Sequence, residues 1–113
     1  MTLYTNLDHI SSEKEFHKII EENEQVMICC GRMGPMCTPV YMEMEYLRNE
    51  YKSVKFYDML FDNPDSHVIT KLPECVGFMG LPFTVYFKNG KVVKATGSIQ
   101  SRDQITTILD TEF

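Results

Sequence analysis

Apolar residues recur along the chain with two different periods, which separate predicted helices from predicted strands. After Ser11 and Ser12, either of which can cap a helix, Phe16, Ile19 and Ile20 are spaced as on one helical face, and this helix is predicted to end near Asn23. Residues 25–30 form a continuous apolar run between turn-forming residues, which is typical of a buried central strand. A short first strand is expected within residues 3–10.

The middle of the chain repeats the alternation of helix and strand. Residues 31–35 indicate a loop, and a long helix is predicted from there to about Tyr51, in which Pro39 fits only the first turn or a kink. Residues 54–60 predict another strand. A turn at residues 62–64 then leads to a short helix over residues 65–72, before Pro73.

The clearest local signal lies near the C-terminus. Two β-rich runs, residues 83–88 and 91–96, are joined by Asn89-Gly90, which predicts a hairpin with a type I′ turn. Gly97 breaks the second strand, and residues 101–110 predict a final helix. The element order is therefore β-α-β-α-β-α-β-β-α, which predicts an α/β fold with a mixed sheet and helices on both faces.

Length and charge narrow the class of protein. The chain has 113 residues and is 43% hydrophobic, which predicts one domain over residues 1–113. A net charge of -5 argues against nucleic-acid binding. The longest apolar stretch, residues 26–30, is too short to cross a membrane, and the first ten residues lack the pattern of a signal peptide. We therefore expect a cytoplasmic protein without a membrane partner.

Four cysteines carry the candidate chemistry: Cys29, Cys30, Cys37 and Cys75. They form no C-x-x-C pair, and without an export signal redox or metal chemistry is more natural for them than a structural disulfide framework. The three histidines show no zinc-type spacing with the cysteines and are expected in solvent. Methionines around Cys37 would suit Cu(I), but packing or surface roles explain them more simply, so we expect neither metal nor cofactor.

The segment Gly80-Leu81-Pro82-Phe83-Thr84, with the Asn89-Gly90-Lys91 turn and Gly97 after it, resembles the thioredoxin family. The resemblance covers most of the chain from Gln25 onward. It implies the thioredoxin fold, with a central mixed β-sheet of four to five strands flanked by four helices. It also implies a cis peptide bond before Pro82, beside the redox site, where the backbone can pair with an extended peptide.

The chain departs from that family at its redox motif. A gapless alignment places Gly34-Pro35-Met36-Cys37 on the family's Cys-Gly-Pro-Cys, so that only the second cysteine remains and is the more sheltered one. In this alignment Met33 replaces a tryptophan, and Ile28 replaces a buried aspartate that serves proton transfer. A second alignment places Cys37-Thr38-Pro39-Val40 on the motif and makes Cys37 an exposed attacking thiol. We prefer the first alignment and keep the second open.

Both alignments place Cys37 at the start of a helix, where free N–H groups and the helix dipole favour a thiolate. A lone thiol can form mixed disulfides but needs a resolving partner to complete a reduction. Cys30 and Cys75 are the candidates for that partner. Against this, Cys29 and Cys30 fit the pattern of small buried hydrophobes, and Cys75 is open between a surface thiol and a functional one.

Two functions follow. The first is a thiol–disulfide oxidoreductase of weak or atypical activity, with Cys37 as the reactive thiol. The alternative is an inactive binding or adaptor module that uses the groove beside Pro82. In either case the partner is a protein or peptide with a disulfide or an extended segment. The expected groove residues are Met33, Gly34, Pro35, Met36, Leu81 and Pro82.

Overall fold

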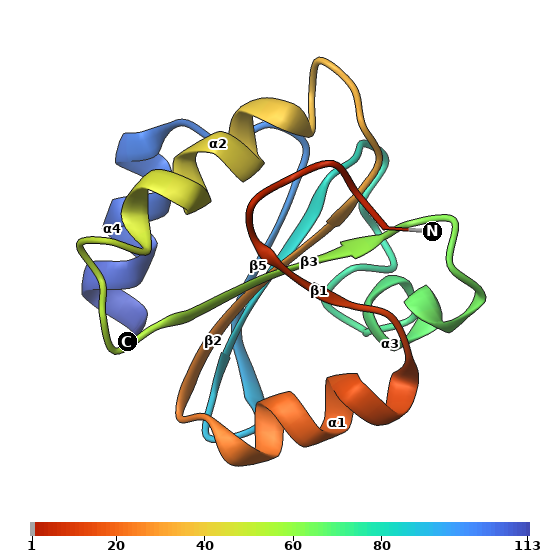
Figure 1. Cartoon of the computed structure of the whole chain (residues 1–113), viewed down its shortest axis with the longest axis horizontal. Helices are drawn as coiled ribbons and strands as arrows, with labels where there is room; N and C mark the ends of the chain where they lie inside the picture. The colour runs from red at the N-terminus through yellow and green to blue at the C-terminus, as the bar shows by residue number, and fades with distance from the viewer. Residues whose placement is uncertain (1) are drawn as a thin grey trace.

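The computed structural model describes residues 2–113, and its elements follow the predicted order (Figure 1). They are β1 (Asp8–Ile10), α1 (Glu13–Glu22), β2 (Gln25–Gly31), α2 (Thr38–Leu47), β3 (Lys55–Leu60), a 3-10 turn (Pro64–Ser66), α3 (His67–Thr70), β4 (Phe83–Lys88), β5 (Lys91–Gly97) and α4 (Arg102–Glu112).

The five strands form one mixed sheet in the order β1-β3-β2-β4-β5. β1 and β2 both pair with β3 in parallel, whereas β4 runs antiparallel to β2 and to β5. The central strand β2 is buried along nearly all its length, as its apolar run predicts. The carboxyl ends of β2 and β3 therefore meet at one edge, where the loop to α2 begins.

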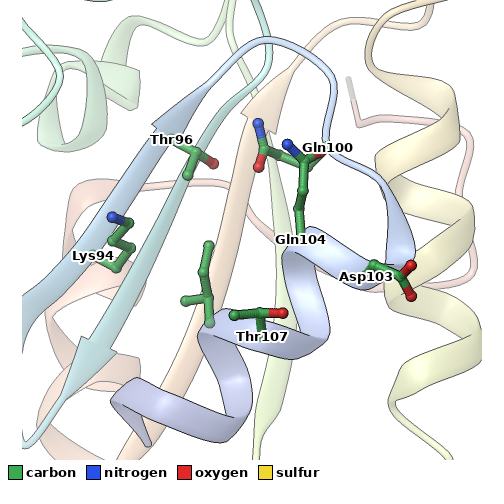
Figure 2. A pocket seen from close by; sticks show the side chains of 7 residues that line it. Lys94, Thr96, Gln100, Asp103, Gln104 and Thr107 are labelled. Atoms are coloured by element: carbon green, nitrogen blue, oxygen red, sulfur yellow. The ribbon is translucent and has the colours of Figure 1, made fainter.

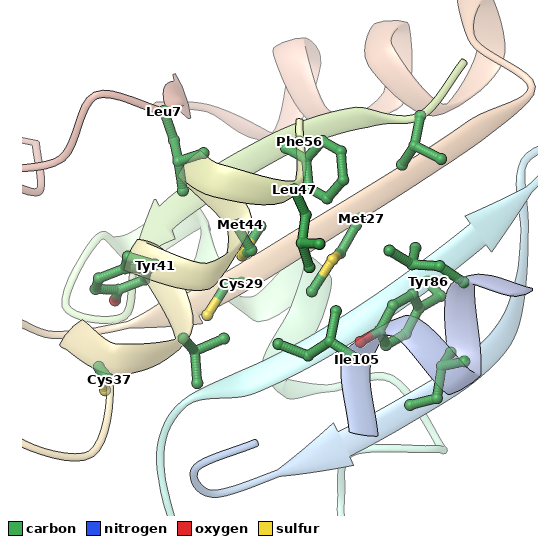
Figure 3. Packing of buried hydrophobic residues seen from close by; sticks show 14 of the residues in the cluster. Leu7, Met27, Cys29, Cys37, Tyr41, Met44, Leu47, Phe56, Tyr86 and Ile105 are labelled. Atoms are coloured by element: carbon green, nitrogen blue, oxygen red, sulfur yellow. The ribbon is translucent and has the colours of Figure 1, made fainter. Parts of the chain in front are cut away.

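Helices cover both faces of the sheet, and each face has its own apolar core. α2 and α4 pack on the face that carries Met27, Cys29 and Tyr86 (Figure 3). α1 and α3 pack on the opposite face, against Val26, Ile28 and Val85 among others. We call these the α2/α4 face and the α1/α3 face.

The signals in the sequence explain where most elements begin. The Ser12 side chain caps α1 by accepting a hydrogen bond from the Glu15 N–H. Ser101 and Gln104 form a reciprocal capping box at α4. In the β4–β5 turn both Asn89 and Gly90 have positive φ (54° and 79°), as a type I′ turn requires.

Three predicted elements are longer than the observed ones. α2 ends at Leu47 instead of near Tyr51, because the backbone tightens into turns after Arg48. The helix predicted over residues 65–72 is a 3-10 turn followed by the four-residue α3. β1 has only three residues, because residues 4–7 bend across the α2/α4 face before the strand begins.

This N-terminal strap, residues 2–7, is part of the core of the α2/α4 face. Leu3 and Leu7 are both 3% exposed. Asn6 binds Glu45 of α2 through its backbone N–H and its side-chain amide, and Arg48 donates a hydrogen bond of 2.6 Å to the Asn6 carbonyl. The strap is therefore fastened to α2 and buries its two leucines in the core of the α2/α4 face.

Candidate functional site

The loop between β2 and α2 brings Cys37 against the end of the central strand. Cys37 is the N-cap residue of α2, and Pro39 occupies the first turn, as expected. The residue at the end of β2 is Gly31, and a Cβ there would lie 2.8 Å from the Cys37 sulfur, 2.7 Å from the Tyr41 hydroxyl and 3.1 Å from the Pro82 Cβ. Only glycine permits this close approach of the three groups.

Pro82 belongs to a second loop, which precedes β4 and meets the first one at Gly31. The Leu81–Pro82 peptide bond is cis, as the resemblance implies. The Ser98 N–H donates to the carbonyls of Gly80 and Pro82, at 3.0 Å each, and so ties this loop to the end of β5. Cys37 and Pro82 therefore lie at one site, although they are far apart in the sequence.

The Cys37 sulfur is buried, whereas methionine side chains in its loop and in the loop before Pro82 are exposed. Cys37 is only 4% exposed, in agreement with the alignment that makes it the protected cysteine. Met33 and Met36 in the same loop are 42% and 44% exposed, and Met79, in the loop before Pro82, is fully exposed. The Cys37 thiol is thus largely closed to bulk solvent, while methionine side chains of its own loop are exposed.

The loop that carries Cys37 is fastened at its start by contacts with β3 and α2. The Phe61 N–H donates to the Gly31 carbonyl (2.7 Å), and the buried Tyr41 hydroxyl donates to the Arg32 carbonyl (3.0 Å). The Arg32 side chain makes two hydrogen bonds of 2.8–2.9 Å to the separate oxygens of Asp62. This ion pair raises the pKa of Arg32 and lowers that of Asp62.

Cys30 and Cys75 lie together in the core of the α1/α3 face, whereas Cys37 belongs to the core of the α2/α4 face. All four cysteines are free thiols. Burial raises the pKa of Cys30 to about 12 and that of Cys75 to about 11, so both are protonated at neutral pH. Cys75 is 1% exposed, which excludes the surface-thiol alternative; its backbone is bonded to Leu72 and Phe78, and its side chain lies in the core.

The largest feature missed from the sequence is a buried carboxylate. Asp58 of β3 is completely buried; it accepts hydrogen bonds from the Thr5 hydroxyl and from His9 Nδ1, the latter at 2.6 Å. Burial raises the pKa of Asp58, and the bonds from Thr5 and His9 oppose the rise. The expectation that all three histidines lie in solvent was wrong for His9, whose side chain is 28% exposed and points to Asp58.

Asp58 belongs to a line of polar side chains that crosses all five strands. In the strand register His9 pairs with Asp58, Asp58 with Cys29, Cys29 with Thr84, and Thr84 with Thr96. Paired residues share a face of the sheet, so this polar row lies on the α2/α4 face, two residues from Gly31 along β2. The Thr84 hydroxyl donates to the Cys29 sulfur at 3.7 Å.

A separate hollow lies at the Thr96 end of the polar row. A cavity of about 440 Å³ between β5 and α4 is lined by Lys94, Thr96, Gln104 and Ile108 among others, and it includes no residue of the Cys37 loop (Figure 2). Within residues 2–113 no cluster of three or more histidine, cysteine or acidic side chains is placed to hold a metal ion. No helix in that part of the chain has the length and hydropathy to cross a membrane.

Comparison with solved structures identifies the fold. The thioredoxin of Fasciola hepatica superposes with a TM-score of 0.79 and 16% identity, covering 95% of this chain and all of that one. The thioredoxin of Trypanosoma brucei brucei gives 0.72 and 21%, covering 95% and 94% of the two chains. Mitochondrial thioredoxin 3 of Saccharomyces cerevisiae, in its oxidised form, gives 0.74 and 18%, covering 92% and 94%.

No family model and no curated protein sequence matches the chain. The chain thus has the thioredoxin fold, as its C-terminal segment predicts.

Proposed function

We propose that this protein is a thioredoxin-like thiol protein in which Cys37 forms a mixed disulfide with a protein or peptide partner. The observation that carries the proposal is that the Cys37 sulfur, at the start of α2, and Pro82 both come close to Gly31 at the end of β2. A helix start supplies free N–H groups and a positive dipole end, both of which favour the thiolate needed for attack.

The chemical step is a thiol–disulfide exchange. The Cys37 thiolate attacks one sulfur of the partner's disulfide; a bond between Cys37 and that sulfur forms while the partner's own S–S bond breaks. The leaving sulfur departs as a thiolate and takes a proton from water. One partner sulfur is then bonded to Cys37 in a mixed disulfide. A second thiol must attack this mixed disulfide to release the partner.

The resolving thiol is the open step of this proposal. Cys30 and Cys75 are the candidates for that thiol, but they lie in the core of the opposite face of the sheet, and their high pKa values leave few thiolates at neutral pH. Release would therefore be slow within this chain, or it would use an external thiol such as a second redox protein. Weak turnover is the expected behaviour.

The partner is expected to dock over the apolar surroundings of Cys37. Met33, Gly34, Pro35 and Met36 would form one side of the groove, and Leu81 and Pro82 the other. Flexible, polarisable methionine side chains suit such an adaptable surface. A cytoplasmic location, where thiols stay reduced, fits this chemistry and remains a prediction.

The experiment is an insulin-type disulfide reduction assay with a thiol reductant. Wild-type protein should accelerate the reaction weakly, and Cys37→Ser should abolish the acceleration. Cys29→Ser is the matched control, because Cys29 is buried in the same core and has no proposed part in the chemistry. Full activity in Cys37→Ser would contradict the proposal.

A second candidate function is a binding module without turnover, favoured by the burial of Cys37 beneath exposed methionines. It predicts a partner whose affinity is unchanged by Cys37→Ser and reduced by Met33→Ser. A partner captured as a mixed disulfide by the wild type and lost in Cys37→Ser would instead support the first function.

A further inference from the structure

The methionines within residues 2–113 divide into two groups by exposure. Three are completely buried in the two cores: Met27, Met44 and Met59. Four present their side chains to solvent: Met33, Met36, Met42 and Met79. All four cysteines, by contrast, are buried, and Cys37 is the most exposed of them at only 4%. The sulfur-containing side chains that are open to a water-borne oxidant are therefore thioethers.

Three of the exposed methionines belong to the two loops that meet at the Cys37 site. Met33 and Met36 lie in the loop between β2 and α2, and Met79 lies three residues before Pro82. The two loops meet where Cys37 and Pro82 both approach the end of β2. The same two loops thus carry the buried thiol and three exposed thioethers.

Met79 lies between two residues that are fixed to the rest of the fold. The Phe78 ring packs on that of Phe83, with their centroids 5.6 Å apart. The Gly80 carbonyl accepts a hydrogen bond of 3.0 Å from the Ser98 N–H. Met79 itself belongs to neither core and is fully exposed, so core packing does not account for a large apolar side chain at this position.

We propose that Met33, Met36 and Met79 form a modification site, at which a peroxide oxidises the thioethers to sulfoxides and thereby weakens the docking of a protein partner over Cys37. The effect on docking rests on the proposed function. A thioether is apolar and adaptable, whereas a sulfoxide is polar. A partner that covers an oxidised methionine must bury this polar group away from water, which costs binding free energy.

The chemical step transfers one oxygen atom from the peroxide to sulfur. With hydrogen peroxide, a lone pair of the thioether sulfur attacks one peroxide oxygen, and the S–O bond forms while the O–O bond breaks. The leaving hydroxide takes the proton from the oxygen now on sulfur, which gives a sulfoxide and water. Sulfur is oxidised by two electrons and the peroxide is reduced by two. Methionine sulfoxide reductases reverse the change.

The experiment treats the protein with hydrogen peroxide at pH 5 and then with dithiothreitol. Thiols are largely protonated at this pH, whereas a thioether has no proton to lose, and dithiothreitol reverses any sulfenic acid or disulfide that forms. Peptide mapping by mass spectrometry gives the rate of sulfoxide formation at each methionine. The three loop methionines should oxidise about tenfold or more faster than the buried Met27 and Met44.

The effect on docking is measured on the same samples after removal of dithiothreitol. Oxidised protein should form the mixed disulfide with insulin at least about fivefold more slowly than untreated protein does. Its rate with dithiodipyridine, a small neutral disulfide that needs no docking surface, should change by less than about twofold. Treatment with methionine sulfoxide reductases A and B should restore the insulin rate.

A triple variant, Met33→Leu with Met36→Leu and Met79→Leu, keeps apolar side chains of similar volume but removes the oxidisable sulfur. Its insulin rate should be the same before and after peroxide treatment. Met42→Leu is the matched control, because Met42 is 64% exposed but lies on α2, outside the two loops. This variant should lose as much of its insulin rate after peroxide as the wild type.

Sulfoxide formation at the loop methionines no faster than at Met27 and Met44 would overturn the proposal. An insulin rate that peroxide leaves unchanged in the wild type, or lowers equally in the triple variant, would also overturn it. Untreated protein whose Cys37 does not react with insulin would contradict the proposed function and, with it, the effect on docking. The relative rates of sulfoxide formation test the modification site in either case.

Discussion

The two faces of the sheet differ in the chemistry that they bury. On the α1/α3 face the inward residues of the central strands are Val26, Ile28 and Cys30, which pack against aliphatic and aromatic neighbours. On the α2/α4 face the same strands bring in Cys29, Asp58 and Thr84. Burial is complete on both faces, so exposure alone does not distinguish them.

The contrast shows that one sheet can bury apolar side chains on one face and a row of polar side chains on the other. The α1/α3 face gains free energy from apolar burial with little polar cost. On the α2/α4 face the buried Asp58 carboxylate costs desolvation free energy, and this face also packs against the loop that carries Cys37. A period of two along each strand is enough to keep the two environments apart.

Moving an acid to the apolar face should have the largest effect. Ile28→Asp would place a carboxylate among apolar side chains that offer it no hydrogen-bond donor, and we expect a loss of about 3–5 kcal/mol in the free energy of unfolding. Urea unfolding followed by circular dichroism measures it. Ile28→Val is the control and should cost about 1 kcal/mol. A loss for Ile28→Asp no larger than the control would remove the distinction between the faces.

The native acid on the α2/α4 face should give a smaller effect that depends on pH. The folded-state pKa of Asp58 is raised by burial, so the folded state holds this proton more tightly than the unfolded chain does. Its contribution is therefore fully present below the unfolded pKa, near 3.9, and is lost as pH rises through the folded pKa. A tenfold difference in proton affinity between the two states corresponds to about 1.4 kcal/mol of stability.

The stability of Asp58→Asn relative to wild type should accordingly increase with pH over that range and then become constant. Unfolding at a series of pH values gives the difference curve. Asp8→Asn, which removes an exposed acid, should give a flat difference. A relative stability of Asp58→Asn that falls with rising pH would show that the bonds from His9 and Thr5 outweigh the cost of burial.

Two buried tyrosines on the α2/α4 face should differ by about 1 kcal/mol. Tyr41 donates a hydrogen bond to the Arg32 carbonyl, whereas no residue within the described part of the chain bonds the buried Tyr86 hydroxyl. Tyr41→Phe should cost about 1 kcal/mol, and Tyr86→Phe should be neutral or stabilising. Equal losses in the two variants, measured by urea unfolding, would contradict this assignment.

The smallest perturbation is chemical: the buried thiols of the α1/α3 face should react more slowly in the folded protein than in the unfolded chain. With pKa values of about 11 and about 12, Cys75 and Cys30 should alkylate roughly a hundredfold and a thousandfold more slowly at pH 8 than the same cysteines in urea. Peptide mapping after iodoacetamide treatment gives each rate. Modification of either thiol as fast as in urea would place it outside the closed core.

The sequence predicts those parts of the fold that local chemistry determines. Asn89-Gly90 predicts its turn because few other residues accept positive φ at both positions, and Ser12 and Ser101 predict helix starts through their side-chain oxygens. Element ends were less predictable. Helix α2 ends at Leu47, and the Asn49 and Glu50 N–H groups then bond carbonyls three residues back, a tightening of the last turn that helix propensity does not locate.

The candidate site was predictable only in part, because its contacts join distant segments. Cys37 and Pro82 were expected from the resemblance, whereas the burial of Cys75 depends on how the loop after α3 folds inward. Asp58 was missed, although a single acid within an otherwise apolar strand, Lys55–Leu60, is a signal that could have found it. Its partners Thr5 and His9 lie about fifty positions away, and nothing local indicates them.

The order of the strands also bears on self-association. β5 is an outer strand of seven residues, long enough to offer backbone groups to another chain. Lys91 and Lys94 are exposed along it, and two such strands brought together would set like charges side by side. The longer open edge of the sheet is thereby protected against edge-to-edge aggregation, and concentrated solutions should stay clear at low salt and lose this protection as salt screens the lysines.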